Sequence, residues 1–423
     1  MRSVELVFNA RRAVQASHSL GPDVLAALAP FSPVRARLVR RFHAALPAYA
    51  PTPLHSLDAL AARLGLGRVF VKDESRRFGL KAFKALGASW AVARLLARRL
   101  GLPSDSVGPA LLSALRTPEA RKRVGEMTLV TATDGNHGRG LAWAARLFGL
   151  PAVVFMPRGS AEARAEAVRA LGARCEITDL SYDDAVRHAA AYARATGGVL
   201  TQDTAWAGYE EIPRWIMQGY TSLALESLEQ MRALGGRGPT HIFLQAGVGS
   251  FAAAVLGFFA TEAAEAGHAA PLVVSVEPHN ADCVFRSVRA GDGRARPVRG
   301  ALRTMMAGLA CGEVSTLAWK ILREGLFAAA ACPDGVAAHG MRLLAAPLPG
   351  DPALVSGESG AVGAGLLDYL ANAPEAVVLR DALGLNGHAV VLLVSTEGDT
   401  APEIHRQVVR EGVCPFAFRG QTT

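Results

Sequence analysis

Two of the chain's few lysines stand three positions apart in "FGLKAFKALGAS", residues 78–89. A neutral lysine amine can attack an aldehyde and form a Schiff base, whereas an arginine guanidinium stays protonated in a protein. Covalent carbonyl chemistry is therefore open to only five of the 45 basic residues: Lys72, Lys81, Lys84, Lys122 and Lys320.

Lys84 is the lysine best placed for that chemistry. It follows Phe83 and begins an apolar helix, so the helix dipole and burial would both lower the pKa of its ammonium group. Lys81 lies in the preceding loop and could be exposed or could contact an anion. Taken alone, "KAFK" could also be two solvated lysines. The other three look structural, since they lie beside acidic residues, in a charged run or on an amphipathic helix: Lys72, Lys122 and Lys320.

The stretch "TATDGNHGRGLAWAARL", residues 131–147, reads as a strand, a glycine turn and a helix. The backbone N–H groups that follow Gly135 would be free to hold an anion such as a carboxylate. Asn136 adds an amide that could hold a phenolate-like oxygen. Asp134 places a carboxylate at the same helix end, although it could equally be the helix cap.

A second strand, glycine loop and helix occupy residues 241–259 in "HIFLQAGVGSFAAAVLGFF". Its backbone donors and one hydroxyl could hold a phosphate: Gly247, Gly249 and Ser250. The same letters fit a GxGxxA dinucleotide fingerprint that ends at Ala252, with Glu277 closing the next strand. The loop alone therefore does not distinguish a nicotinamide cofactor from a smaller phosphate-bearing one.

Strands and helices that would position these loops alternate along the chain. Near-continuous apolar runs are typical of strands buried on both faces of a parallel sheet. They predict an α/β fold with two open twisted sheets flanked by helices, and the expected strands are 68–72, 127–133, 152–157, 174–179, 198–203, 241–247, 272–278 and 389–396. Ser56 is expected to cap a helix that Gly65 ends. The polar segment 101–126 is expected to be a surface insertion.

Composition narrows the classes of protein. A chain of 423 residues with 50% hydrophobic content can bury a large core in two or three domains. The net charge of +8 comes from arginines spread along helices, which favours a small anionic ligand over nucleic acid. No apolar run suggests a membrane span or secretory leader, so a cytoplasmic location is expected. The five cysteines predict free thiols and no metal site, although Cys283 and Cys311 could meet.

The Phe-Lys pair, the "DGNHG" turn and the glycine loop together resemble the fold-type II pyridoxal-phosphate enzymes. The three motifs follow one another in the same order as in those enzymes, and the resemblance covers about residues 51–400. Longer strings resemble one family of that tryptophan synthase β and threonine dehydratase-like superfamily, the diaminopropionate ammonia-lyases: "RFGLKAFKALG", "TATDGNHGRGLAWAA", "TQDTAWAGYEEIPRWIMQGY", "QAGVGS", "MAGLACGE" and "STEGDT".

This resemblance implies an enzyme of amino acid catabolism that uses pyridoxal 5'-phosphate and acts as a homodimer. It also implies elimination of ammonia from both D- and L-2,3-diaminopropionate, with pyruvate as the product. Two domains are expected: a large cofactor-binding domain of residues 1–88 and 206–423, and a small mobile domain of residues 89–205.

Site roles follow from the resemblance position by position. Lys84 would form the Schiff base with the cofactor, and Asn136 would bind its 3-oxygen. Either Ser395 or Thr396 would face the pyridine nitrogen, and such a hydroxyl partner leaves that nitrogen largely unprotonated. The phosphate would be held by Gly247, Val248, Gly249 and Ser250. The substrate would bind at the turn, and His137 would orient that turn. The expected substrate-binding residues are Thr133, Asp134, Gly135 and His137.

Asp134 departs from the serine that usually precedes this turn in serine and threonine deaminases. A β-ammonium group on the substrate needs an anion beside it, and Asp134 and Asp203 of "TQDTAW" could provide two. The resemblance makes Asp134 the expected base for the D isomer, and Lys84 or Asp203 the expected base for the L isomer. The alternative for Asp203 is that it caps the following helix.

Three other functions stay open at this point. A related pyridoxal-phosphate enzyme could act on serine or threonine, or catalyse β-replacement. A nicotinamide-dependent oxidoreductase would explain the glycine loop and Glu277, but would leave "KAFK" and "DGNHG" without a purpose. A basic binding protein without catalysis is favoured only by the isoelectric point.

Overall fold

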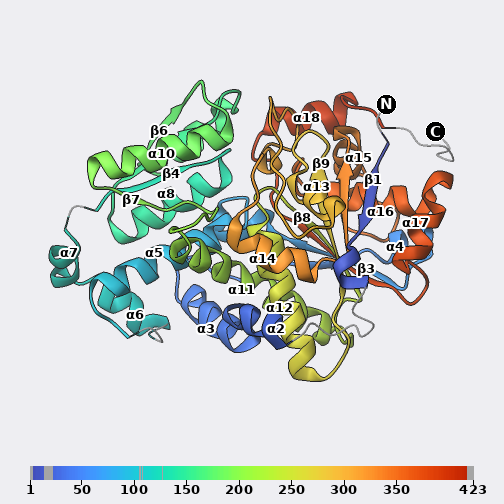
Figure 1. The fold of residues 1–423 in the computed structure, drawn as a ribbon, viewed down its shortest axis with the longest axis horizontal. Helices are drawn as coiled ribbons and strands as arrows, with labels where there is room; N and C mark the ends of the chain where they lie inside the picture. Colours follow the sequence, from blue (N-terminus) through green and yellow to red (C-terminus); the bar gives the residue numbers. More distant parts are fainter. Residues whose placement is uncertain (1–2, 14–21, 104–105, 107, 126, 417–423) are drawn as a thin grey trace.

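The computed structural model describes residues 3–13, 22–103, 106, 108–125 and 127–416, and within them eleven strands form two sheets (Figure 1). The larger sheet has the order β1-β10-β9-β8-β11-β3-β2 and the smaller one β6-β5-β4-β7. The strands are β1 (Glu5–Phe8), β2 (Leu54–Ser56), β3 (Arg68–Asp73), β4 (Leu129–Ala132), β5 (Ala152–Met156), β6 (Arg174–Ile177), β7 (Val199–Leu200), β8 (His241–Gln245), β9 (Leu272–Pro278), β10 (Ala328–Cys332) and β11 (Val390–Ser395).

Helices connect these strands and cover both sheets. They are α1 (Ala10–Ala13), α2 (Pro22–Leu28), α3 (Pro33–Ala44), α4 (Asp58–Leu64), α5 (Lys84–Arg99), α6 (Gly108–Leu115), α7 (Pro118–Val124), α8 (Asn136–Phe148), α9 (Glu162–Arg169), α10 (Tyr182–Thr196), α11 (Glu211–Ala233), α12 (Ser250–Ala266), α13 (Cys283–Ala290), α14 (Thr316–Gly325), α15 (Asp334–Ala345), α16 (Val362–Asn372), α17 (Val377–Leu383) and α18 (Pro402–Glu411).

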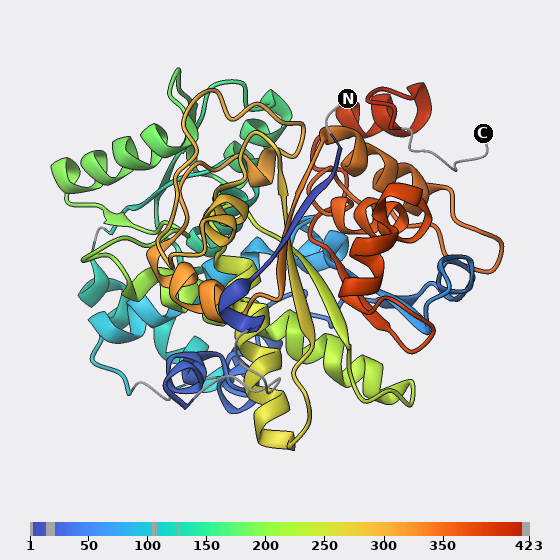
Figure 2. The ribbon, with the colours of Figure 1, turned by 45° about the vertical axis from the view of Figure 1, so that its right-hand side comes forward.

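The larger sheet lies between two helical layers (Figure 2). Its five central strands are parallel, and only the edge strands β1 and β2 run antiparallel to their neighbours. Successive residues of a strand point to opposite faces, so Ile242 and Leu244 pack against the layer containing α5, α11 and α12. Phe243 packs against the layer containing α4, α15 and α16. All five parallel strands therefore end at one edge of the sheet, where their loops can meet.

The smaller sheet is parallel throughout and is also covered on both faces. Val130 and Phe155 pack on α10, while Leu129 and Val154 face the core shared with α8 and α9. Helix α5 packs on both α8 and α11, and so links the smaller sheet to the larger one. Its first residue is Lys84.

Most of the expected elements are confirmed. Each of the eight apolar runs contains a strand, and Gly65 ends α4 with φ +65°. The Ser56 cap is wrong, because Ser56 ends β2 and Leu57 is the N-cap residue of α4. Segment 101–126 is more than a surface insertion, since it forms α6 and α7 and buries apolar side chains in the main core; residues 104, 105, 107 and 126 lie outside the described part. Three strands were not expected: β1, β2 and β10.

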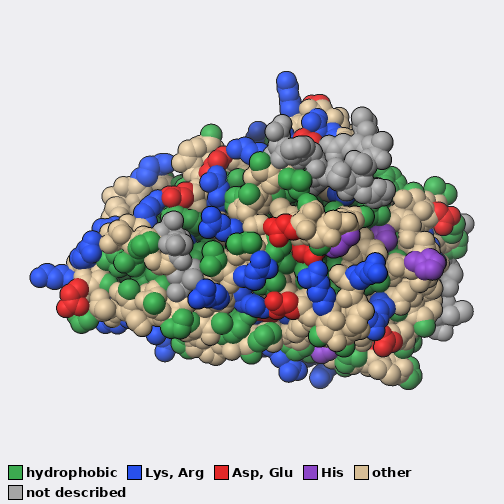
Figure 3. Space-filling view, turned by 90° about the horizontal axis from the view of Figure 1, so that it is seen from below, with side chains coloured by type: hydrophobic (Ala, Val, Ile, Leu, Met, Phe, Trp, Pro, Cys, Tyr) green, Lys and Arg blue, Asp and Glu red, His purple; other side chains and the backbone are tan. Residues whose placement is uncertain are grey.

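The division into domains at residues 88/89 and 205/206 stays a prediction, and α5 runs across the first boundary. On the face shown in Figure 3, Lys and Arg side chains are distributed among apolar and acidic ones. In the described part of the chain, none of the helices is long and apolar enough to cross a membrane.

Gly87 of α5 and Gly219 of α11 allow these two helices to cross closely near the start of α5. A Cβ atom on Gly219 of α11 would lie 2.4 Å from the carbonyl oxygen of Leu86. We therefore expect Gly219→Ala to lower the free energy of unfolding by about 1–3 kcal/mol, because backbone atoms would have to move apart. Gly387→Ala is the control, since its Cβ would meet nothing within 4 Å. Denaturant unfolding of both variants tests this, and equal stability of the two would contradict it.

Candidate active site

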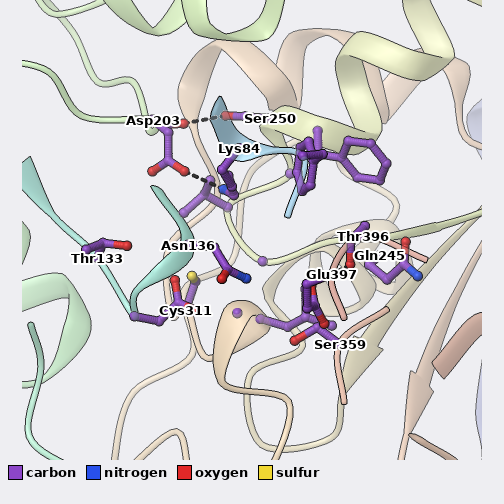
Figure 4. A pocket seen from close by; sticks show the side chains of 18 of the residues that line it. Lys84, Thr133, Asn136, Asp203, Gln245, Ser250, Cys311, Ser359, Thr396 and Glu397 are labelled. Atoms are coloured by element: carbon purple, nitrogen blue, oxygen red, sulfur yellow. Dashed lines mark hydrogen bonds and ion pairs between the residues drawn. The ribbon is translucent and has the colours of Figure 1, made fainter. Parts of the chain in front are cut away.

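One pocket collects side chains from both sheet units (Figure 4). The loop after β4 contributes Thr133, Asp134 and Asn136, and the loop after β8 contributes residues 247–250. Lys84 enters from the start of α5, and residues 396–397 follow directly after β11. The site therefore lies at the carboxyl ends of parallel strands, the usual position for a ligand in such sheets.

Lys84 forms an ion pair with Asp203, and its Nζ lies 2.5 Å from the Asp203 Oδ2. Burial alone would lower the pKa of Lys84, but the charge of Asp203 outweighs it and raises that pKa. Burial would likewise raise the pKa of Asp203, yet the lysine charge lowers it to about 2. The expected lowered pKa of Lys84 is therefore wrong for this state of the protein. The helix-cap alternative for Asp203 also fails, because the N-cap residue of the following helix, α11, is Glu210.

The turn after β4 is shaped by Thr133 and Gly135. The Thr133 hydroxyl oxygen accepts hydrogen bonds from the backbone N–H of Gly135 at 3.0 Å and of Gly138 at 3.2 Å. Gly135 has φ +139°, which favours glycine, and it is the N-cap residue of α8. The first N–H groups of α8, beginning at Asn136, have no partner within the helix and can hold an anion.

Asp134 has a buried carboxylate oxygen in this pocket. Among the described residues, its Oδ2 has no hydrogen-bond partner. The carboxylate does not cap α8, whose N-cap position belongs to Gly135 and has no side-chain hydrogen bond. Burying a charged group without a partner is costly, so this carboxylate is positioned for a cation or a hydrogen-bond donor that enters the pocket.

His137 supports the turn from behind. Its Nε2 donates a hydrogen bond to the Thr201 carbonyl oxygen at 2.8 Å, and its Nδ1 lies 3.9 Å from the Asp203 Oδ2. Burial lowers the pKa of His137, which favours the neutral ring. The ring thus ties the turn to the segment carrying Asp203, as expected of a residue that orients the turn.

The glycine loop is closely packed, with no room for larger side chains. Gly249 has φ +86°, and a Cβ there would lie 2.8 Å from Leu322 Cδ1. A Cβ on Gly247 would lie 3.1 Å from Cys311 Sγ. Ser250 begins α12, and its hydroxyl donates a hydrogen bond to the Asp203 carbonyl oxygen at 2.7 Å. Backbone N–H groups at a helix start have no partner within the helix, and without bulky side chains beside them they suit a phosphate.

Glu277 does not reach this loop. Its side chain is fully buried and accepts hydrogen bonds from the backbone N–H of Val284 at 2.8 Å and of Phe285 at 2.6 Å. In a dinucleotide site, the acidic residue after the second strand must face the cleft to bind the ribose. The geometry therefore gives no support to a nicotinamide site.

The strand β11 ends with two hydroxyl residues that point differently. Ser395 donates a hydrogen bond to the Ser356 hydroxyl at 2.8 Å and is not part of the pocket wall. Thr396 lines the pocket together with Glu397. Thr396 is therefore the better placed of the two candidates. Sequence reasoning missed Glu397, although it is the next letter of "STEGDT". Other residues of the pocket wall that it missed include Tyr182, Gln245, Phe251, Gly308, Leu309, Cys311 and Ser359.

The partly buried lysine and the glycine loop together fit a cofactor with an aldehyde and a phosphate. A family model described as "Pyridoxal-phosphate dependent enzyme" matches residues 45–381 of the chain. The chain belongs to the pyridoxal-phosphate dependent enzymes. Its cofactor is pyridoxal phosphate, and its architecture is that of fold type II.

Relatives of this pyridoxal-phosphate dependent enzyme include diaminopropionate ammonia-lyases. The protein of that name from Salmonella typhimurium is 51% identical over 375 residues, covering 88% of this chain and 91% of the relative. A crystal structure of diaminopropionate ammonia-lyase from Escherichia coli, in complex with an aminoacrylate-PLP azomethine reaction intermediate, matches with a TM-score of 0.86. It is 43% identical in sequence, and the match covers 98% of this chain and 99% of that one.

Threonine deaminase from Solanum lycopersicum shares the fold of this enzyme at 18% identity. The match has a TM-score of 0.67 and covers 97% of each chain.

Other lysines of this pyridoxal-phosphate dependent enzyme are engaged elsewhere. Lys81 Nζ lies 2.7 Å from the Asp399 Oδ1, and its side chain is 43% exposed. Lys72 is fully buried, and its Nζ contacts Glu226 Oε2 at 2.8 Å. The acidic residues next to Lys72 in the sequence were expected to balance its charge. Lys320 pairs with Glu210 at 3.1 Å, and Lys122 is exposed.

All five cysteines of the enzyme are free thiols in the structure. Cys283 and Cys311 both lie next to Gly247, and Cys283 Sγ donates to the Gly247 carbonyl oxygen at 3.6 Å. Within the described residues, no group of three or more His, Cys, Asp or Glu side chains is arranged to hold a metal ion.

Proposed function

We propose that the chain eliminates the β-amino group of 2,3-diaminopropionate, as either the D or the L isomer, and yields pyruvate and ammonia. The names of the relatives that are 51% and 47% identical support this substrate. The observation that carries it is the carboxylate oxygen of Asp134, buried in the pocket without a partner. A β-ammonium group on the substrate would supply the missing hydrogen-bond donor together with a positive charge.

Four sets of residues would hold the cofactor. Lys84 would carry the covalent link, Asn136 would bind the 3-oxygen, and Thr396 would face the pyridine nitrogen. The phosphate would lie on the backbone of residues 247–250 at the start of α12. Bound pyridoxal phosphate supplies an aldehyde for the substrate's α-amino group and a conjugated ring that draws electrons from the Cα–H bond.

Asp203 would act as a base only after Lys84 loses its positive charge. While Lys84 is an ammonium group, its charge keeps the pKa of Asp203 low. Once the substrate amine has displaced Lys84 and left it as a neutral amine, the positive charge that most lowers the pKa of Asp203 is gone, and burial raises that pKa. Asp203 Oδ2 can then accept a proton, and Asp203 or Lys84 would remove the Cα proton of the L isomer.

Asp134 would remove the Cα proton of the D isomer, which points to the opposite side when the other substituents stay in place. Asp134 comes from the turn after β4, whereas Asp203 follows β7, so the two carboxylates reach the pocket from different segments. The substrate carboxylate would bind the free N–H groups at the start of α8, with Thr133, Gly135 and His137 keeping the turn in shape.

The smaller sheet unit would close over the bound substrate and exclude water. Arg164 of α9 forms an ion pair with Glu358, and both are almost completely buried beside the pocket. This pair joins a helix of the smaller unit to the loop before α16, and so supports such closure. The homodimer implied by the resemblance and the cytoplasmic location expected from the sequence remain proposals, and the mass of the native enzyme in solution tests the first.

Product analysis separates this function from its rivals. With either isomer of diaminopropionate, we expect two ammonia molecules for each pyruvate, because elimination releases one and hydrolysis of the remaining enamine releases the other. We expect much slower release of the keto acid from serine, which would give pyruvate, and from threonine, which would give 2-oxobutyrate, because their hydroxyl gives Asp134 no positive charge to contact. A preference for serine or threonine would contradict the proposal, as would a β-substituted amino acid formed when a thiol is added.

A further inference from the structure

Polar side chains gather at the end of the pocket away from the lysine. In Figure 4, Thr396, Gln245, Glu397 and Ser359 lie together on one side, whereas Lys84 and Ser250 lie on the other. The pyridine nitrogen is opposite the ring carbon that bears the aldehyde. With Lys84 at the aldehyde and the phosphate at the glycine loop, that nitrogen therefore faces the end formed by Thr396 and Glu397.

Glu397 is held tightly against Thr396. The Thr396 hydroxyl donates a hydrogen bond to Glu397 Oε2 at 2.7 Å, and the Gly360 backbone N–H donates one to Oε1 at 2.7 Å. The Glu397 side chain is buried, and a Cβ on Gly357 would lie 2.8 Å from its Cγ. The backbone of Glu397 also pairs with Ala82 in the lysine loop. This carboxyl group cannot turn away from the hydroxyl without a wider rearrangement.

The charges around Glu397 allow it to titrate near neutral pH. Burial, followed by the negative charge of Glu358 on the adjacent loop, raises the pKa of Glu397 to about 7. The positive charge of Arg164 on α9 acts in the opposite direction. On the side of the lysine loop, Lys81 is paired with Asp399.

We propose that the protonation state of Glu397 decides whether the Thr396 hydroxyl donates a hydrogen bond to the pyridine nitrogen of the bound cofactor. A hydroxyl group has one proton to donate. When Glu397 has lost its proton to solvent, the Thr396 proton points to Glu397 and the unprotonated nitrogen receives no hydrogen bond from Thr396. When Glu397 is protonated, it donates to Thr396, whose own proton then points to the nitrogen. Glu397 is thus a positioning residue, because it sets the direction in which the Thr396 hydroxyl donates its proton.

The other polar groups at this end do not offer the same exchange. Both N–H groups of Gln245 are used by the carbonyl oxygens of Gly360 and Val394, at 2.9 and 2.8 Å, and an amide does not titrate. Ser395 is turned toward Ser356. Ser359 also lines the pocket, but a hydroxyl without a titrating partner cannot gain or lose a proton at neutral pH.

The test uses holoenzyme loaded with pyridoxal phosphate labelled with ¹⁵N at the pyridine nitrogen. We expect its ¹⁵N resonance to move between about pH 6 and about pH 8, around the pKa of Glu397 at about 7, because ionisation of Glu397 redirects the Thr396 proton. In Glu397→Gln the side-chain amide can keep both hydrogen bonds but cannot titrate, so the resonance should stay near the position of a neutral nitrogen. Thr396→Val should also stop the movement, whereas Ser395→Ala and Ser359→Ala should retain it.

A wild-type resonance that does not move with pH would overturn the proposal, without reliance on any variant. Equal movement in the wild type and Glu397→Gln would also overturn it. The inference rests on the proposed placement of the cofactor and not on the substrate. A failure of the diaminopropionate assay would therefore leave this measurement unaffected, and a misplaced cofactor would show as a Lys84-independent absorption band.

Discussion

Asp134→Asn is expected to lower kcat/KM for D-diaminopropionate by at least about 100-fold, while the L isomer loses less than about tenfold. The amide has the same shape as the carboxylate but cannot accept the Cα proton. The substitution also removes the negative charge that would contact the β-ammonium group of both isomers. Turnover of the L isomer should therefore fall as well, but by less than that of the D isomer. Steady-state assays with each pure isomer measure both values.

The matched control for this prediction is Asp203→Asn. It should lower turnover of the L isomer more than that of the D isomer, so the ratio of the two rates should move in opposite directions in the two variants. Asp203 also contacts Lys84, and a smaller loss with the D isomer is expected for that reason. Equal losses with both isomers in both variants would show that the two carboxylates do not divide the work.

Lys84→Ala should lose both turnover, by at least about 1,000-fold, and the visible absorption band of the bound cofactor. Lys81→Ala should keep both, because that side chain is half exposed and paired with Asp399. Lys84→Arg is a further control, since a guanidinium can keep the contact with Asp203 but cannot attack an aldehyde. Retention of the band in Lys84→Arg would exclude a covalent role for this lysine.

Features that depend on neighbouring residues could be predicted from the sequence. The glycine turns at Gly135 and Gly249 adopt positive φ angles at the starts of α8 and α12, as strand, glycine and helix signals in a row indicate. The apolar runs gave the strands for the same reason. Strand β10 was not predicted, because its sequence "AAAAC" contains no β-branched residue. Only the neighbouring parts of the fold make it a buried strand.

Features that depend on distant residues could not be predicted in the same way. The expected pKa of Lys84 was based only on its helix and its apolar surroundings. The residue that raises this pKa is Asp203, which is 119 residues away in the chain. Thr396 could not be chosen over Ser395 without knowing that Ser395 binds Ser356, 39 residues earlier. Glu397 became meaningful only when the fold placed its carboxyl group in the pocket beside Thr396.

Reductive trapping tests most directly whether Lys84 is the amine that captures the cofactor. Borohydride converts the bond between a lysine and the bound cofactor into a stable amine, and peptide mapping then identifies the modified residue. We predict that the cofactor mass is found on Lys84 alone, in the peptide that contains "AFKALGASW". Modification of Lys81 or another lysine, or no modified lysine in holoenzyme that shows the absorption band, would contradict the account.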